Sequence, residues 1–262
     1  MTVLSLQIED AMNSTTLPST RRDAQWFYVW MSGIFVLIAF SGFIPTYWAK
    51  LASGTFTGAP ILHIHGMLFF TWTLFFLVQT TLVATGHIPN HRNWGLAGIA
   101  LATAMGITVV IAAINSIKAA GLIGMADEAR RFSFVSLSGL AMFATFFALA
   151  IANIHRKDIH KRLLLLAMIP LMHAALARLF MTAFAPADAK GPPPVFVAIP
   201  PGLTVDLLIV AAIIHDWRTR GRPHPVYLIG GATIVAVQLL SLPISATPTW
   251  MAIAKWVESL AR

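Results

Sequence analysis

The chain has 262 residues, of which 57% are hydrophobic and only 11% are charged, whereas a soluble domain has roughly 25% charged residues. This composition excludes an ordinary water-soluble fold, and the long apolar runs indicate membrane-spanning α-helices. The net charge of +8 does not indicate nucleic-acid binding, because the basic residues lie in short clusters between apolar runs, where they act as orientation signals.

Seven apolar runs, separated by polar segments or by segments rich in Pro and Gly, predict seven spans. They cover residues 26–48, 61–86, 94–117, 133–155, 161–184, 201–217 and 225–244. The predicted fold class is therefore all-α, an integral membrane helical bundle. It divides into a cytoplasmic N-terminal segment at residues 1–25, a transmembrane domain at residues 26–245 and a C-terminal segment at residues 246–262. In the last segment apolar and charged residues alternate as in a short amphipathic helix that lies at the membrane interface.

The charges of the loops predict the orientation of the bundle. More Lys and Arg residues fall on the side of the N-terminus than on the opposite side, which favours a cytoplasmic N-terminus. The residues on that side are Arg21, Arg22, Arg92, Arg156, Lys157, Lys161, Arg162, Arg218, Arg220 and Arg222. The predicted location is the bacterial inner (plasma) membrane, with the lipid bilayer as surroundings and a larger membrane-protein complex left open as a partner.

Six of the nine histidines fall at one membrane face, at the ends of three predicted cytoplasmic hairpins: His87, His91, His155, His160, His215 and His224. Because the chain has no cysteine, a bound metal or haem would need His, Met, carboxylate or backbone ligands. The candidate metal ligands are His91, His160 and His215. Alternatively, histidines beside Arg and Lys bind anionic lipid headgroups and anchor the loops.

A second group of candidate residues lies toward the opposite face. His63 and His65 follow Pro60 at the start of the second predicted span. Two positions on a helix differ by about 200 degrees, so only one ring would face the bundle, and His65 is the better inward candidate. Arg178 could meet a haem propionate or an anionic substrate near this pair, or it could extend outward to water. The alternative for the histidine pair is hydrogen bonding to loop carbonyls.

His173 and Asp206 are ionisable residues inside predicted spans, where such groups are costly and are functional candidates. By helical rise they lie about 18 Å and about 16 Å from the cytoplasmic ends of their helices, so they could meet near the midplane. A carboxylate can fix the tautomer of a ligand histidine or relay a proton through it. Alternatively, the pair only fixes the helix order. Pro170 predicts a kink in the same helix as His173.

Several short motifs carry a resemblance. They are HIHG at 63–66, Gln79, His91-Arg92 and His160-Lys161-Arg162, which is followed by the apolar run containing Arg178. With these motifs the chain resembles a family of uncharacterised bacterial polytopic membrane proteins that carry histidines at helix ends. The resemblance covers roughly residues 60–240 and implies a fold and a membrane location, without a particular activity. In layout only, the chain is distantly similar to cytochrome b-type membrane proteins, in which paired histidines hold haem.

The leading functional hypothesis is a membrane redox or cofactor-handling protein that binds haem b or a transition metal ion through histidines. Its candidate cofactor-binding residues are His63, His65, His173, Arg178 and Asp206. One alternative is a proton- or anion-coupled transporter built on His173, Asp206 and Arg178, and another is a non-catalytic subunit or assembly factor of a membrane complex. The sequence contains no nucleophile motif, phosphate loop or dinucleotide fingerprint, so no catalytic residue is predicted and enzymatic activity stays open.

Overall fold

The computed structural model describes residues 19–186 and 188–261, with side chains from residue 25 onward. Seven of the described helical segments are long and apolar enough to cross a membrane, which confirms the predicted all-α membrane bundle. The long helices are α2 (Ser19–Gly42), α4 (Pro60–Ala84), α5 (Ile88–Gly121), α6 (Ala126–Ala152), α7 (Lys157–Phe184), α8 (Ile199–Arg220) and α9 (Pro225–Ser245). The short helices are the π-helix η1 (Ile44–Trp48), α3 (Ala49–Ala52), the 3₁₀-helix η2 (Val195–Ala198) and α10 (Pro248–Ser259).

Two helices begin well before the predicted spans. α5 begins at Ile88 and α6 at Ala126, although the apolar runs begin near residues 94 and 133. The extra turns are polar but helical. A proline in the first turn of α5 is compatible with the start of a helix. In α6, the negative charges of Asp127 and Glu128 in the first turn stabilise the positive end of the helix dipole. Most of the predicted N-terminal segment, residues 1–25, lies outside the described residues.

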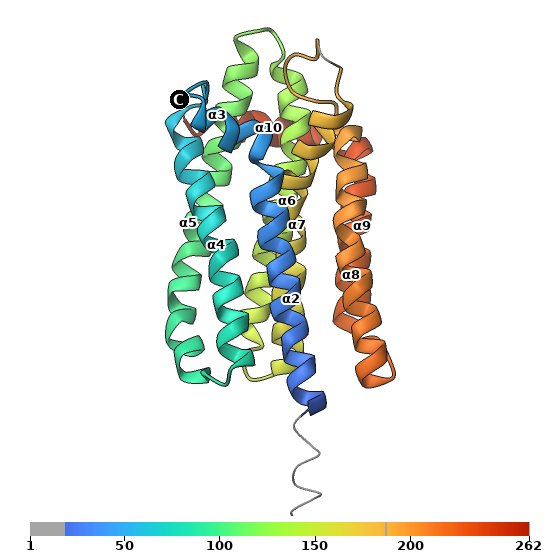
Figure 1. Cartoon of the computed structure of the whole chain (residues 1–262). Helices are drawn as coiled ribbons and strands as arrows, with labels where there is room; N and C mark the ends of the chain where they lie inside the picture. Colours follow the sequence, from blue (N-terminus) through green and yellow to red (C-terminus); the bar gives the residue numbers. More distant parts are fainter. Residues whose placement is uncertain (1–18, 187, 262) are drawn as a thin grey trace, which may run out of the picture.

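Helix α7 lies at the centre of the bundle and packs against α2, α6, α8 and α9. Figure 1 shows α4 and α5 on one side of this central helix and α8 and α9 on the other. The middle of α7 is fully enclosed, with Leu165, Leu166, Met168 and Ile169 each 0% exposed. A residue on α7 can therefore reach the interior of the bundle, which is where the midplane candidate His173 lies.

Helix α10 has 12 residues and a length of about 18 Å, which is too short to span a membrane. It packs against α5, α6 and α9, and it buries Ala254 and Val257 while Trp256 is exposed. Two contacts attach it to Arg130 of α6: the guanidinium binds the Glu258 carboxylate at 2.8 Å, and the Trp250 indole N–H donates to the Arg130 carbonyl at 2.9 Å. Pro248–Ser259 of the C-terminal segment thus forms a helix that is attached to the bundle, while its predicted position at the membrane interface stays a prediction.

Candidate functional site

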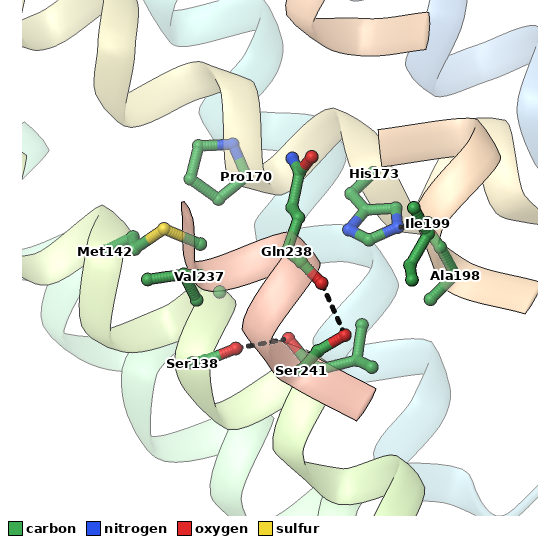
Figure 2. Close-up of a pocket in the computed structure, with 11 residues that line it drawn as sticks. Ser138, Met142, Pro170, His173, Ala198, Ile199, Val237, Gln238 and Ser241 are labelled. Atoms are coloured by element: carbon green, nitrogen blue, oxygen red, sulfur yellow. Dashed lines mark hydrogen bonds between the residues drawn. The ribbon is translucent and has the colours of Figure 1, made fainter. Parts of the chain in front are cut away.

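A small cavity lies where α6, α7, η2, α8 and α9 meet. It has a volume of about 20 Å³, which is enough for a single water molecule. Its polar lining comes from His173 on α7, Ser138 on α6, and Gln238 and Ser241 on α9. Pro170, one turn before His173, also lines the cavity, and the side chains of Pro170, Gln238 and His173 lie together there (Figure 2).

The His173 ring is oriented by a backbone group. Its Nε2–H donates to the carbonyl of Ala198, at the end of η2, at 2.5 Å. Because a neutral imidazole has one donor and one acceptor nitrogen, this bond leaves the lone pair on Nδ1. The short helix η2, which was not predicted, thus fixes the tautomer, a role that the sequence hypothesis gave to Asp206.

Asp206 is 6% exposed and pairs with Gln238 instead of His173. The Gln238 amide Nε2 donates to Asp206 Oδ1 at 3.3 Å. The other two oxygens, Asp206 Oδ2 and Gln238 Oε1, are buried and have no hydrogen-bond partner among the described residues. Gln238 is therefore shared between the two candidates, since it binds Asp206 and lines the same cavity as His173.

Gly202 explains how the Gln238 side chain reaches Asp206. It lies one turn before Asp206 on α8, and a Cβ at this position would be only 3.0 Å from the Gln238 amide carbon. This separation is tighter than ordinary van der Waals contact. The absence of a side chain at Gly202 thus leaves the space that the Gln238 amide occupies.

In the second group of candidates, at the end of the bundle opposite the three hairpins, His63 and His65 contact different neighbours. His63 Nδ1 and the Tyr47 hydroxyl share a hydrogen bond of 2.9 Å. His65 Nδ1 lies 3.3 Å from the Thr108 hydroxyl, whose proton is already donated to the Met105 carbonyl. The His65 Nδ1–H is therefore the donor, and its Nε2 keeps a lone pair.

The third candidate of this group, Arg178, has an aromatic neighbour. Its guanidinium carbon lies 4.7 Å from the centre of the Phe43 ring, a cation–π contact. Its Nε is buried and has no hydrogen-bond partner among the described residues. Arg178 thus lies against the aromatic ring with its Nε buried.

Only two of the three predicted metal ligands come together. The rings of His91 on α5 and His160 on α7 have centroids 6.4 Å apart. His160 donates its Nδ1–H to the Ala150 carbonyl at 2.8 Å, while the buried Nδ1 of His91 has no partner among the described residues. His215 lies elsewhere, stacked on Phe27 at 3.8 Å. Within the described part of the chain, no three His, Cys, Asp or Glu side chains are arranged to hold a metal ion.

A buried ion pair that the sequence does not predict lies near the start of α7 and the end of α8. Arg162, which was counted among the loop charges, is 1% exposed, and its Nε donates to Asp216 Oδ2 at 2.8 Å while Nη2 binds Oδ1. Its Nη1 donates to the carbonyl of Asp158 at 2.6 Å, and its guanidinium carbon lies 5.8 Å from the Tyr227 ring centre. One signal was available: Asp216 is an acidic residue among the basic residues at the end of α8, where Arg218 and Arg220 follow it.

His224 stands at the start of α9 near this ion pair. Its Nδ1 accepts a hydrogen bond from the Val226 N–H at 3.2 Å and so caps the helix. Burial lowers the pKa of His224, and the positive charges of Arg162 and Arg220 lower it further. The neutral ring, which is the form that can accept this hydrogen bond, is therefore favoured in the folded protein.

Comparison with protein-family models, with curated proteins and with solved structures finds no match for this chain. The described helices form a membrane protein with seven candidate spans. Because the comparisons give no function, a functional assignment depends on the geometry of the polar residues inside the bundle.

Proposed function

We propose that this protein is a proton-coupled membrane transporter in which Asp206 and Gln238 form the proton-binding site and His173 faces the same cavity. The observation that carries the proposal is a pair of buried oxygens, Asp206 Oδ2 and Gln238 Oε1, that have no hydrogen-bond partner among the described residues. Gln238 also lines a small cavity inside the bundle, together with His173. An ionisable residue at such a position marks a proton or substrate pathway more often than a structural contact.

The chemistry of the pair supports a proton on Asp206. A buried carboxylate without a cation is costly, so the group takes up a proton, and none of the ion pairs among the described residues includes Asp206. A neutral acid offers one O–H and one carbonyl oxygen, which complement the carbonyl oxygen and N–H of an amide. The N–H bond from Gln238 to Oδ1 is present, and a proton on Oδ2 would supply the donor that Gln238 Oε1 lacks.

Loss of that proton changes the pair. With Asp206 ionised, its Oδ2 and Gln238 Oε1 are both acceptors, so they repel each other and the amide turns. Gln238 lines the cavity beside His173, and His173 Nδ1 can accept a hydrogen bond from it. Protonation of Asp206 would thereby control the polar lining of the cavity, which is the coupling that a proton-driven transporter needs.

Infrared spectroscopy of the protein in lipid tests the proton-binding site without knowledge of the solute. As the pH is lowered below neutral, wild-type protein should gain the carbonyl band of a protonated carboxylic acid, and Asp206→Asn should lack this gain. Asp127→Asn is the control, because Asp127 is 63% exposed and pairs with Arg130 away from the Asp206 site. If the band is absent, or survives in Asp206→Asn, the proposal is wrong.

A flux measurement then tests transport itself. In proteoliposomes with an imposed pH gradient, the wild type should carry protons that a trapped pH-sensitive dye detects, and Asp206→Asn should reduce the flux to that of empty liposomes. Asp127→Asn should behave as the wild type. Flux that exceeds that of empty liposomes and is equal for wild type and Asp206→Asn would exclude coupling through this site.

The second candidate function is binding of haem b or a transition metal through histidines, and the closeness of His91 and His160 favours it. His160 gives its Nδ1–H to a backbone carbonyl, as metal-bound histidines generally do, and this leaves its Nε2 as a ligand. Metal analysis and an absorbance spectrum of the purified protein test this function. A stoichiometric metal, or a haem Soret band, that His91→Ala removes and His215→Ala retains would support it, and neither signal in the wild type would refute it.

A further inference from the structure

The outer end of α2 changes its helical geometry where it meets α7. α2 ends at Gly42, and a Cβ at this residue would overlap the Ala175 carbonyl of α7, so the two backbones are in close contact. The chain then continues as the π-helix η1, in which both Tyr47 N–H and Trp48 N–H bond to the Phe43 carbonyl, at 2.9 and 3.1 Å. Single π-turns of this kind occur frequently at functional sites.

Three buried polar atoms at this junction have no hydrogen-bond partner among the described residues. They are Arg178 Nε, Trp48 Nε1 and Thr46 Oγ1. The two nitrogens can only donate, and a hydroxyl can donate as well. A helical threonine usually satisfies its hydroxyl with a carbonyl one turn back, and Thr46 does not. The junction therefore has a surplus of donors.

Aromatic contacts place these donors around one cluster. Arg178 lies over the Phe43 ring at 4.7 Å. Phe43 and Trp48 both pack on Phe70 of α4, with ring centroids 5.6 and 4.8 Å away. Trp48 lies one π-turn after Phe43, and Thr46 lies between them, while η1 as a whole contacts α7.

Within the described part of the chain, Arg178 has no acidic partner. None of the ion pairs among the described residues includes Arg178, although a buried guanidinium without a counter-ion is costly. The surroundings therefore favour a ligand that brings negative charge and accepts hydrogen bonds.

We propose that the junction of η1 and α7 is an oxyanion-binding site, in which the Arg178 guanidinium binds a carboxylate or phosphate group and Trp48 and Thr46 donate to it. The planar fork of arginine matches both groups. Arg178 lies about 9 Å from the outer end of α7 by helical rise, within reach of a lipid phosphate or of a soluble anion. The site involves none of the residues of the Asp206 proton site, so the two proposals can fail separately.

The first arm of the test uses lipid-free protein in detergent and isothermal titration with inorganic phosphate and with acetate. Arg178→Gln should weaken binding by about 10- to 100-fold, because a hydrogen-bonded charge is lost. Arg131→Gln is the matched control, because Arg131 is exposed near the outer end of α6 and the change in net charge is the same. Thr46→Val and Trp48→Phe, which keep the shape, should each weaken binding by about 2- to 10-fold.

The second arm uses native mass spectrometry after reconstitution with phosphatidylglycerol or phosphatidylcholine. Preferential retention of phosphatidylglycerol that Arg178→Gln abolishes identifies the ligand as a lipid phosphate, whereas binding of phosphate or acetate in the first arm identifies a soluble oxyanion. Arg178→Lys, which keeps the charge without the fork, covers the case in which the Gln variant does not fold, and it should bind more weakly than the wild type. Equal binding by wild type, Arg178→Lys and Trp48→Phe in both arms overturns the proposal.

Discussion

Arg162 and Asp216 form an ion pair whose side chains are only 2% and 1% exposed. Removing one partner leaves the other charge buried and unpaired, which typically costs about 3–5 kcal/mol. We expect Asp216→Asn to lower the free energy of unfolding by an amount of this order in a denaturant titration of the detergent-solubilised protein. The double variant Arg162→Met, Asp216→Leu should regain most of the loss, because no charge is left behind.

The control for this experiment is Asp127→Asn. Asp127 also pairs with an arginine, Arg130, but it is 63% exposed, and such surface pairs contribute about 0–1 kcal/mol. If Asp216→Asn and Asp127→Asn unfold at the same denaturant concentration, the buried pair does not have the stabilising role assigned to it.

His224 gives the helix cap of α9 a dependence on pH. Its pKa is lowered in the folded protein, so the unfolded chain binds the proton more readily and the contribution to stability is present above the unfolded pKa of about 6.5. It is lost as the pH falls through the lower, folded pKa. The melting temperature of the wild type should therefore fall more between pH 7 and pH 5 than that of His224→Asn, which keeps a capping oxygen that does not titrate. Parallel pH profiles would contradict this role.

At the residue scale, the sequence indicates which side chains are candidates but not which of them pair. His173, Asp206 and Gln238 are identifiable as polar residues in apolar runs. Their pairing depends on the rotation of α8 against α9 and on the space at Gly202, neither of which a single helix encodes. The sequence does not show that Arg162 is buried, because its partner Asp216 lies 54 positions away. A basic cluster at a helix end has the same sequence pattern whether all its side chains are exposed or one of them is buried.

At the scale of the helices, Gly42 sets the distance between α2 and α7. A Cβ at this position would overlap the backbone carbonyl of Ala175, which cannot rotate away as a side chain can. Gly42→Ala should therefore lower the free energy of unfolding by about 1–3 kcal/mol, as overpacking does. Thermal unfolding in detergent measures the change.

Gly33, in the same helix, supplies the matched control. It has open space where its Cβ would lie, so Gly33→Ala should be neutral or stabilising by up to about 1 kcal/mol, the difference in helix propensity between the two residues. A result in which Gly33→Ala destabilises more than Gly42→Ala would show that the contact with α7 does not limit the packing of α2.

At the scale of the whole molecule, hydrophobic run length predicted the architecture well. The seven predicted spans correspond to the seven long helices. A chain segment in hydrocarbon must satisfy its backbone hydrogen bonds internally, and an apolar run of this length does so as an α-helix. The short elements η1 and η2 were not predicted. They arise where the chain meets neighbouring helices near a membrane face, as at the close contact of Gly42 with Ala175, and hydropathy does not report such contacts.

The orientation of the bundle is a separate prediction, which cysteine labelling can test. Because the chain has no cysteine, a single one can be introduced at Leu122, between α5 and α6 and 90% exposed, or at His155, between α6 and α7. With the N-terminus in the cytoplasm, a membrane-impermeant maleimide should label Leu122→Cys in intact cells and His155→Cys only after permeabilisation. The reverse pattern would place the N-terminus outside.

Pro170 lies between the two halves of α7 and removes the backbone hydrogen bond to the Leu166 carbonyl, so α7 can bend there. The inner half holds Arg162, which is tied to α8, and the outer half carries His173 and Arg178. A ligand that binds the half with His173 and Arg178 and favours one bend angle of α7 therefore also favours one position of the half with Arg162. If an oxyanion at Arg178 and a proton at Asp206 favour different bend angles, each must weaken the binding of the other by the same factor, and measurement of either affinity at two concentrations of the other ligand would give that factor.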